Sequence, residues 1–117
     1  MNDVVLDLAV VDRLRQLTPT GEPDVLANVL SLFLQEGRRR IGGIHLACRT
    51  GDAAEVHRVA HSLKGSAGNI GATALYLLCR EIDDRASEGD MSGAALLVEA
   101  LDREYARVEA EIARLMG

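Results

Sequence analysis

The chain has 117 residues and a formal net charge of −5; 48% of its residues are hydrophobic, only 3% are aromatic, and tryptophan is absent. This length fits one domain with a single core, and a core of Leu, Val, Ile and Ala suits packed helices better than a β-sandwich or barrel. The acidic balance argues against a nucleic-acid binder. No apolar run reaches the ~18 residues of a membrane-spanning helix, and the acidic N-terminus does not resemble a signal peptide.

Hydrophobic spacing predicts five helices along the chain. The first is short, has its leucines on one side, and stops before Pro19, because proline disfavours helix at the preceding residue. We expect this helix to cap one end of a bundle, with Leu8, Val11, Leu14 and Leu17 facing inward. In chain order, the predicted helices cover residues 5–17, 23–49, 53–69, 73–87 and 94–116.

The second helix is predicted to begin at Gly21-Glu22-Pro23, where proline is tolerated in a first turn. Its glycines at 37, 42 and 43 predict a kink or a close helix approach. The run Arg38-Arg39-Arg40 points in three directions and is best read as a solvated face. The apolar positions expected to face the core are Leu26, Leu30, Phe33, Gly37, Ile41, Ile44 and Cys48.

Short turns separate the remaining helices. Asp52 followed by Glu55 resembles a capping box, and Gly71 is a natural helix stop. Residues 89–93 are predicted as a loop. Because long helices joined by short turns favour antiparallel neighbours, we expect an all-α fold: an antiparallel up-down four-helix bundle with a short additional N-terminal helix, in a single domain over 1–117. The core-facing residues expected in the last two helices are Leu75, Leu78, Ile82, Leu97, Leu101, Val108, Ile112 and Leu115.

The third helix carries an unusual exposed face. One stripe of it is apolar and predicted to be buried: Val56, Val59, Ala60, Leu63, Ala67 and Ile70. His61 lies on the other side, with His57 one turn before it, Lys64 and Gly65 one turn after, and Gly68 two turns after. Each exposed glycine costs a helix about 1 kcal/mol relative to alanine. We interpret the glycines as clearance that lets another molecule approach His61.

The segment Ala60-His61-Ser62-Leu63-Lys64-Gly65-Ser66-Ala67, followed by Gly71-Ala72, resembles the signature of histidine-containing phosphotransfer (HPt) domains. That signature reads A-H-x-L-K-G-S, then S or A, three residues, and G. The resemblance extends from about Leu6 to Leu115, because other features fall where the family has them. These features are Phe33-Leu34, the Gly51-Asp52 turn, the stretch from Leu75 to Cys79 and the long C-terminal helix.

The resemblance implies a phosphorelay carrier and not an enzyme. His61 would accept a phosphoryl group from a receiver domain's aspartyl-phosphate and pass it to another receiver. A neutral imidazole has a free lone pair for such an attack, and the Lys64 ammonium would lie near the phosphoryl oxygens. Gly65, Gly68 and His57 would form the face on which the partner docks. The receiver would bring the Mg²⁺ and the acidic pocket, so we expect no cofactor in this chain.

The partners implied are response-regulator receiver domains, with a hybrid histidine kinase as a further candidate, and the protein is expected to be a cytoplasmic monomer. The sequence lacks a P-loop and a kinase glycine loop, so no direct use of ATP is expected. Cys48 and Cys79 read as reduced, packed thiols, although a disulfide between them stays open. In the family a polar residue on the next helix orients the histidine. No motif identifies that residue here.

Three alternatives accompany this interpretation. A helical-bundle adaptor could regulate a signalling partner by binding alone, without phosphorylation. His57 and His61, four residues apart, could bind Zn²⁺, but no third ligand or H-E-x-x-H pattern supports a metal site. Glu81, Asp83 and Asp84 could suggest metal binding, yet adjacent helical residues diverge, so we expect a solvated face there.

Overall fold

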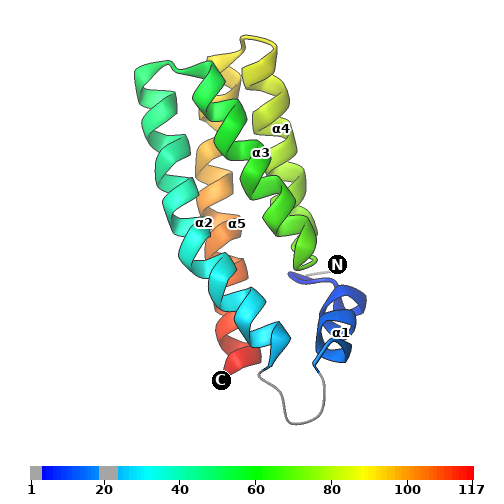
Figure 1. Ribbon diagram of the computed structural model, residues 1–117. Coiled ribbons are helices and arrows are strands. Elements are labelled where there is room, and N and C mark those ends of the chain that lie inside the picture. Colours follow the sequence, from blue (N-terminus) through cyan, green and yellow to red (C-terminus); the bar gives the residue numbers. More distant parts are fainter. Residues whose placement is uncertain (1–3, 19–23) are drawn as a thin grey trace.

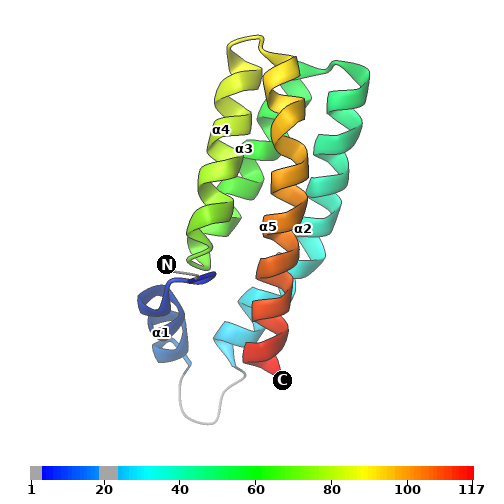
Figure 2. The same ribbon diagram turned by 180° about the vertical axis from the view of Figure 1, so that it is seen from behind.

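A computed structural model of the chain describes residues 4–18 and 24–117. Figure 1 shows that α2 to α5 lie side by side and that the chain reverses at each short turn between them. The short α1 lies at the end where α3 meets α4, and the view from behind in Figure 2 agrees. These described residues contain no strand, which confirms the all-α class. The helices are α1 (Leu8–Gln16), α2 (Val25–Thr50), α3 (Ala53–Asn69), α4 (Thr73–Ser87) and α5 (Met91–Met116).

Aspartate side chains and glycine backbones define most of the helix ends. The backbone N–H of Glu55 donates to Asp52 Oδ1 at 3.1 Å, which satisfies one orphan donor at the start of α3. At the other end of α3, Gly71 adopts φ of 76°, and the N–H of Ala72 donates to the Ala67 carbonyl at 2.9 Å. This is the left-handed helix end that glycine adopts at little cost. The turn places α4 directly beside α3.

The start of α5 differs from the predicted start at residue 94. Asp90 is the N-cap, its Oδ1 accepts from the Gly93 N–H at 2.8 Å, and the helix begins at Met91. A side chain at position 93 would collide with the Asp90 carboxylate. Gly93 therefore belongs to the first helical turn and leaves room for the cap, whereas the sequence suggested a loop.

The first two helices also have different bounds from those expected. α1 begins at Leu8 and not at residue 5, because Asp7 accepts from the Ala9 N–H and caps it. α2 ends at Thr50, one residue later than expected, before Gly51 in the left-handed conformation. α1 ends at Gln16, one residue before the predicted end, and α2 begins at Val25 after its N-cap Asp24. Pro19 and the segment Gly21-Glu22-Pro23 lie outside the described residues.

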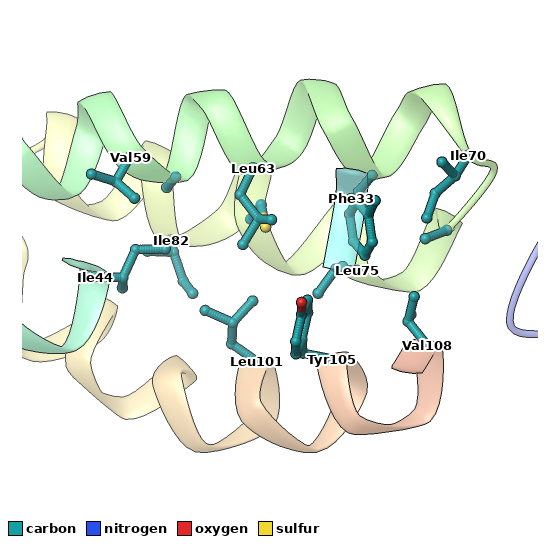
Figure 3. Packing of buried hydrophobic residues seen from close by; sticks show 14 of the residues in the cluster. Phe33, Ile44, Val59, Leu63, Ile70, Leu75, Ile82, Leu101, Tyr105 and Val108 are labelled. Atoms are coloured by element: carbon teal, nitrogen blue, oxygen red, sulfur yellow. The ribbon is translucent and has the colours of Figure 1, made fainter. Parts of the chain in front are cut away.

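The core fills the space between α2, α3, α4 and α5 (Figure 3). The whole predicted stripe of α3 is buried. The glycines of α2 predict either a kink or a close helix approach, and at Gly37 the structure shows a close approach of α2 to α5. A Cβ at this position would lie 2.6 Å from the Tyr105 hydroxyl. Several residues expected in the core are only half-buried because they lie at the edges of their stripes: Ile41, Cys48, Leu78, Leu97 and Leu115.

The docking of α1 corrects the stripe predicted for it. Val11 is buried, but Leu8 and Leu17 are each 62% exposed. The helix is held instead through its preceding residues: Leu6 is buried, and the Asp7 N–H donates to the Gly71 carbonyl at 2.8 Å. Only one edge of α1 therefore meets the rest of the protein, at the turn that follows the His61 helix.

Candidate functional site

His61 projects from the exposed face of α3, with 64% of its side chain accessible to solvent. The buried stripe on the opposite side fixes the orientation of the helix, because Leu63, Ala60 and Ala67 are fully buried. His57 is also exposed, and the centroids of the two imidazoles lie 5.9 Å apart. α3 thus presents two neighbouring imidazoles on one open face.

Asp83 of α4 lies against both imidazoles. Its Oδ2 is 3.7 Å from Nδ1 of His61, and its Oδ1 accepts a hydrogen bond from Nδ1 of His57. Only 6% of Asp83 is exposed, and the Ser87 hydroxyl also donates to its Oδ1, at 3.4 Å. The solvated face expected at Asp83 is therefore wrong, because this carboxylate is buried against the exposed face of α3 and lies beside both imidazoles.

A helical-wheel argument could have found Asp83. It follows the buried Cys79 by four residues and the buried Ile82 by one, so it borders the core-facing stripe of α4. The neighbouring Asp84 lies about 100° further round and is exposed. In the sequence Glu81, Asp83 and Asp84 look like one acidic cluster, which hides the position of Asp83 at the edge of the stripe.

The position of Asp83 assigns different roles to the two ring nitrogens of His61. A carboxylate near one imidazole nitrogen favours a proton on that nitrogen and so sets the tautomer. Here the carboxylate lies on the Nδ1 side. Nε2 then carries the lone pair, on a ring that is mostly exposed. The arrangement suits nucleophilic attack by Nε2 on an incoming electrophile.

Lys64 and the two glycines lie on the same face. Lys64 is half-buried, and within the described part of the chain its ammonium has no ion pair. A Cβ at Gly65 would meet nothing within 4 Å, whereas a Cβ at Gly68 would lie 3.5 Å from the Tyr76 ring. Gly65 therefore borders open space next to His61, and Gly68 lets α3 approach Tyr76 of α4.

His57 is more firmly attached than a flanking surface residue would be. The sequence predicts only that it borders the docking face, and 54% of its side chain is exposed. Its Nδ1, however, is engaged by Asp83 and lies 3.3 Å from the Ser87 hydroxyl.

Over residues 4–18 and 24–117, no group of three or more His, Cys, Asp or Glu residues could hold a metal ion.

The arginine run of α2 points in three directions. Arg38 pairs with Glu109 of α5 at 2.8 Å and Arg39 with Glu36 of its own helix, while Arg40 donates to the Ser66 hydroxyl at 2.7 Å. Ser66 thus serves as a contact between α2 and α3. His45, the one histidine of α2, lies 2.8 Å from Asp102 of α5, so it joins two helices away from His61.

The thiol of Cys79 lies beneath the site. Burial raises the pKa of Cys79 to about 12, while the nearby Lys64 charge lowers it and the Asp83 charge raises it. Both cysteines are free, and Cys79 is fully buried. Of the helices described, none has the length and apolar character to cross a membrane.

Comparisons with known proteins agree with one another. A family model described as Hpt domain matches residues 28–111. Histidine-containing phosphotransfer proteins 2 and 5 of Arabidopsis thaliana are 28% and 26% identical, over 85% and 89% of this chain. The chain spans 65% of the length of the first and 68% of the second.

Solved structures extend the similarity. Histidine-containing phosphotransfer protein B (HptB) from Pseudomonas aeruginosa PAO1 superposes with a TM-score of 0.88 at 29% identity, covering 97% of this chain and 95% of that one. MtHPt2 from Medicago truncatula gives a TM-score of 0.84 at 19% identity, covering 96% and 77% of the two chains. The second comparison concerns the fold alone.

Proposed function

The chain belongs to the Hpt domain family, and on that premise we propose that it is a phosphorelay carrier whose phosphoryl group is held on His61. The donor is the aspartyl-phosphate of one receiver domain, and the acceptor is the aspartate of another. The observation that carries this proposal is the geometry of His61: the ring is 64% exposed and has the buried Asp83 carboxylate 3.7 Å from its Nδ1.

The transfer step uses Nε2 of His61 as the nucleophile. Its lone pair forms the P–N bond while the P–O bond to the receiver aspartate breaks, and that aspartate leaves as a carboxylate. The imidazole gains positive charge in this step, because its Nδ1 keeps the proton. The Asp83 carboxylate stabilises that charge, and the reverse reaction on a second receiver restores the neutral ring.

The other residues of the face have supporting roles. The Lys64 ammonium interacts with the phosphoryl oxygens as a mobile point charge. Gly65 provides clearance for the receiver, since no atom lies within 4 Å of the place of its missing side chain. Gly68 and His57 border the docking face, and His57 additionally holds Asp83 in position.

The rest of the assignment follows from this role. We propose that residues 1–117 act as one domain, that α2 to α5 form an antiparallel up-down four-helix bundle, and that α1 caps one end. The chain is a phosphocarrier and not an enzyme in its own right. Receivers, and a hybrid histidine kinase as an upstream source, are its partners; it acts as a monomer in the cytoplasm.

Intact mass after mixing with a panel of phosphorylated receiver domains tests the proposal. We expect a gain of one phosphoryl group that is acid-labile and base-stable, and its loss in His61→Gln. Because the side chain is exposed, the free energy of unfolding of this variant should lie within about 0.5 kcal/mol of that of the parent. His45→Gln is the matched control, because His45 lies on α2 and pairs with Asp102.

Two results would contradict the proposal. One is phosphorylation that persists in a folded His61→Gln protein, which would place the group elsewhere. The other is binding to a receiver with no phosphoryl gain, which would favour the adaptor role that the sequence left open.

A further inference from the structure

We infer that Arg80 of α4 is a second phosphoryl-binding cation, which acts together with Lys64 of α3 across the interface between the two helices. The inference rests on the proposed function and deepens it: the ligand is the dianionic phosphoryl group on His61. No motif in the His61 segment points to Arg80, because it lies on a different helix.

The register of α3 against α4 brings Lys64 and Arg80 to the same level. His61 faces Asp83 at 3.7 Å, and seven residues further along α3 the site of a Gly68 Cβ faces Tyr76 at 3.5 Å. Tyr76 precedes Asp83 by seven residues. The two helices are therefore antiparallel here, and moving a number of residues towards the C-terminus of α3 corresponds to moving the same number towards the N-terminus of α4. Lys64 is three residues after His61, and Arg80 is three residues before Asp83.

A helical wheel places Arg80 on the correct side of α4. At 100° per residue, Tyr76, Arg80, Asp83 and Ser87 all fall within about 60° of one another. Three of these four have observed partners on α3: Tyr76 lies against Gly68, while Asp83 and Ser87 meet His57. Arg80 and Ser87 are the exposed members of the stripe, and the long side chain of Arg80 can extend into solvent on the His61 side.

The electrostatics of Cys79 support this register. Apart from burial, the two influences on the pKa of its thiol are the charges of Lys64 and Asp83. Cys79 immediately precedes Arg80 in α4. The Lys64 charge is therefore near enough to act on the residue of α4 that precedes Arg80.

Neither cation is neutralised by the protein. Most arginines near the helix surfaces have a carboxylate partner: Arg38 with Glu109, Arg58 with Glu55, and Arg85 with Asp90. Within residues 4–18 and 24–117, Lys64 and Arg80 have no ion pair or hydrogen bond from their side chains. Two unpaired cations at one level of the interface repel each other. An anion bound between them is attracted to both and offsets this repulsion.

The two side chains differ in a way that suits a transferable group. Lysine offers a mobile point charge, whereas the planar guanidinium of arginine binds two phosphoryl oxygens at once. Arg80 would hold the orientation of the phosphoryl group, and Lys64 would follow its charge during transfer. Asp83 lies one turn away on the imidazole side, where it faces the ring and not the oxygens.

Phosphorus NMR on the intact protein tests the inference without a receiver. His61 is labelled chemically with phosphoramidate, and the ³¹P shift is followed against pH to find the pH at which the dianionic phosphoryl group takes up one proton. In Arg80→Gln we expect this midpoint to rise by about 0.7 pH unit at low salt, as loss of a unit charge in contact at about 4 Å in water implies. Arg80→Lys should restore most of the difference.

Arg103→Gln is the matched control, because Arg103 is an exposed arginine of α5 and its loss changes net charge equally. Equal midpoints for Arg80→Gln and Arg103→Gln, in proteins with unchanged helical circular dichroism, would overturn the role of Arg80 alone. A wild-type protein that takes no label on His61 would instead overturn the proposed function. The two failures are therefore distinguishable.

Discussion

The carboxylate of Asp83 lies 3.7 Å from Nδ1 of His61, across the interface of two helices. Asp83 is itself 6% exposed and is held by His57 and Ser87. The charge is thus fixed in place before any partner arrives. Preorganised charge next to a developing cation lowers a reaction barrier without reorganisation during the step.

Asp83→Asn should slow phosphoryl transfer to His61 by about tenfold, which corresponds to about 1.4 kcal/mol in the barrier. Asparagine keeps the size of the side chain but removes the charge that balances the imidazolium. Rapid-quench measurement with one phosphorylated receiver gives the rate. Asp84→Asn is the control, since Asp84 is adjacent and exposed; an equal slowing in both variants would show that Asp83 has no special role.

Much of this site follows from sequence periodicity, and the remainder depends on packing between helices. The stripe of Val56, Leu63 and Ile70 orients α3, and all three are buried, so the outward direction of His61 is readable from local spacing. Asp83 belongs to a different helix, and its contact depends on the α3–α4 register. No local pattern in either helix sets that register.

The errors in the first and last helices have the same kind of origin. Leu8 and Leu17 look like core residues by their spacing but are exposed, because α1 meets the protein along one edge only. Gly93 looks like a loop residue, but the Asp90 cap brings it into the first turn of α5. Hydrophobic spacing along one helix predicts neither outcome. The first depends on contact with a turn that is distant in the sequence, and the second on a side-chain hydrogen bond.

Gly37→Ala should lower the free energy of unfolding by about 1 kcal/mol, as the cost of overpacking exceeds the gain in helix propensity. The new methyl group would lie 2.6 Å from the Tyr105 hydroxyl, which donates to the Leu34 carbonyl at 3.1 Å. Gly42→Ala is the matched control in the same helix, since a Cβ there meets nothing within 4 Å. Urea denaturation of both variants should show opposite signs, and two stabilised variants would contradict the close approach of α2 to α5.

Alkaline pH should destabilise the protein through Cys79. Its pKa is about 12 in the folded state against an ordinary value of 9.0, so between these values the unfolded chain loses the thiol proton and the folded one keeps it. Stability is therefore fully present below pH 9 and falls as the pH rises towards 12, by at most about 1.4 kcal/mol per pH unit from this group. Burial also raises the pKa of Tyr105 to about 12. Its ionisation therefore lowers stability at alkaline pH in the same direction as that of Cys79.

Denaturation midpoints between pH 8 and pH 11 measure this effect, and Cys79→Ala should flatten the slope relative to the parent. The same burial should keep the Cys79 thiol from reacting with Ellman's reagent at pH 8 until the protein unfolds. Cys48 is half-buried and should react first. Equal slopes in the two proteins would contradict the buried, protonated state of Cys79.

Substitutions at Gly65 should affect stability and partner access in opposite directions. Gly65→Ala should stabilise the protein by about 1 kcal/mol, since it removes a glycine from a helix interior and the new methyl group meets no atom within 4 Å. Gly65→Gln keeps most of that stability but extends a side chain over the approach to His61. We expect Gly65→Gln to lower the rate of transfer from a phosphorylated receiver at least tenfold, with the chemical labelling of His61 by phosphoramidate nearly unchanged. Gly42→Gln, on the exposed part of α2, supplies the matched change, and a rate as low in this control as in Gly65→Gln would show that clearance beside His61 is not what Gly65 provides.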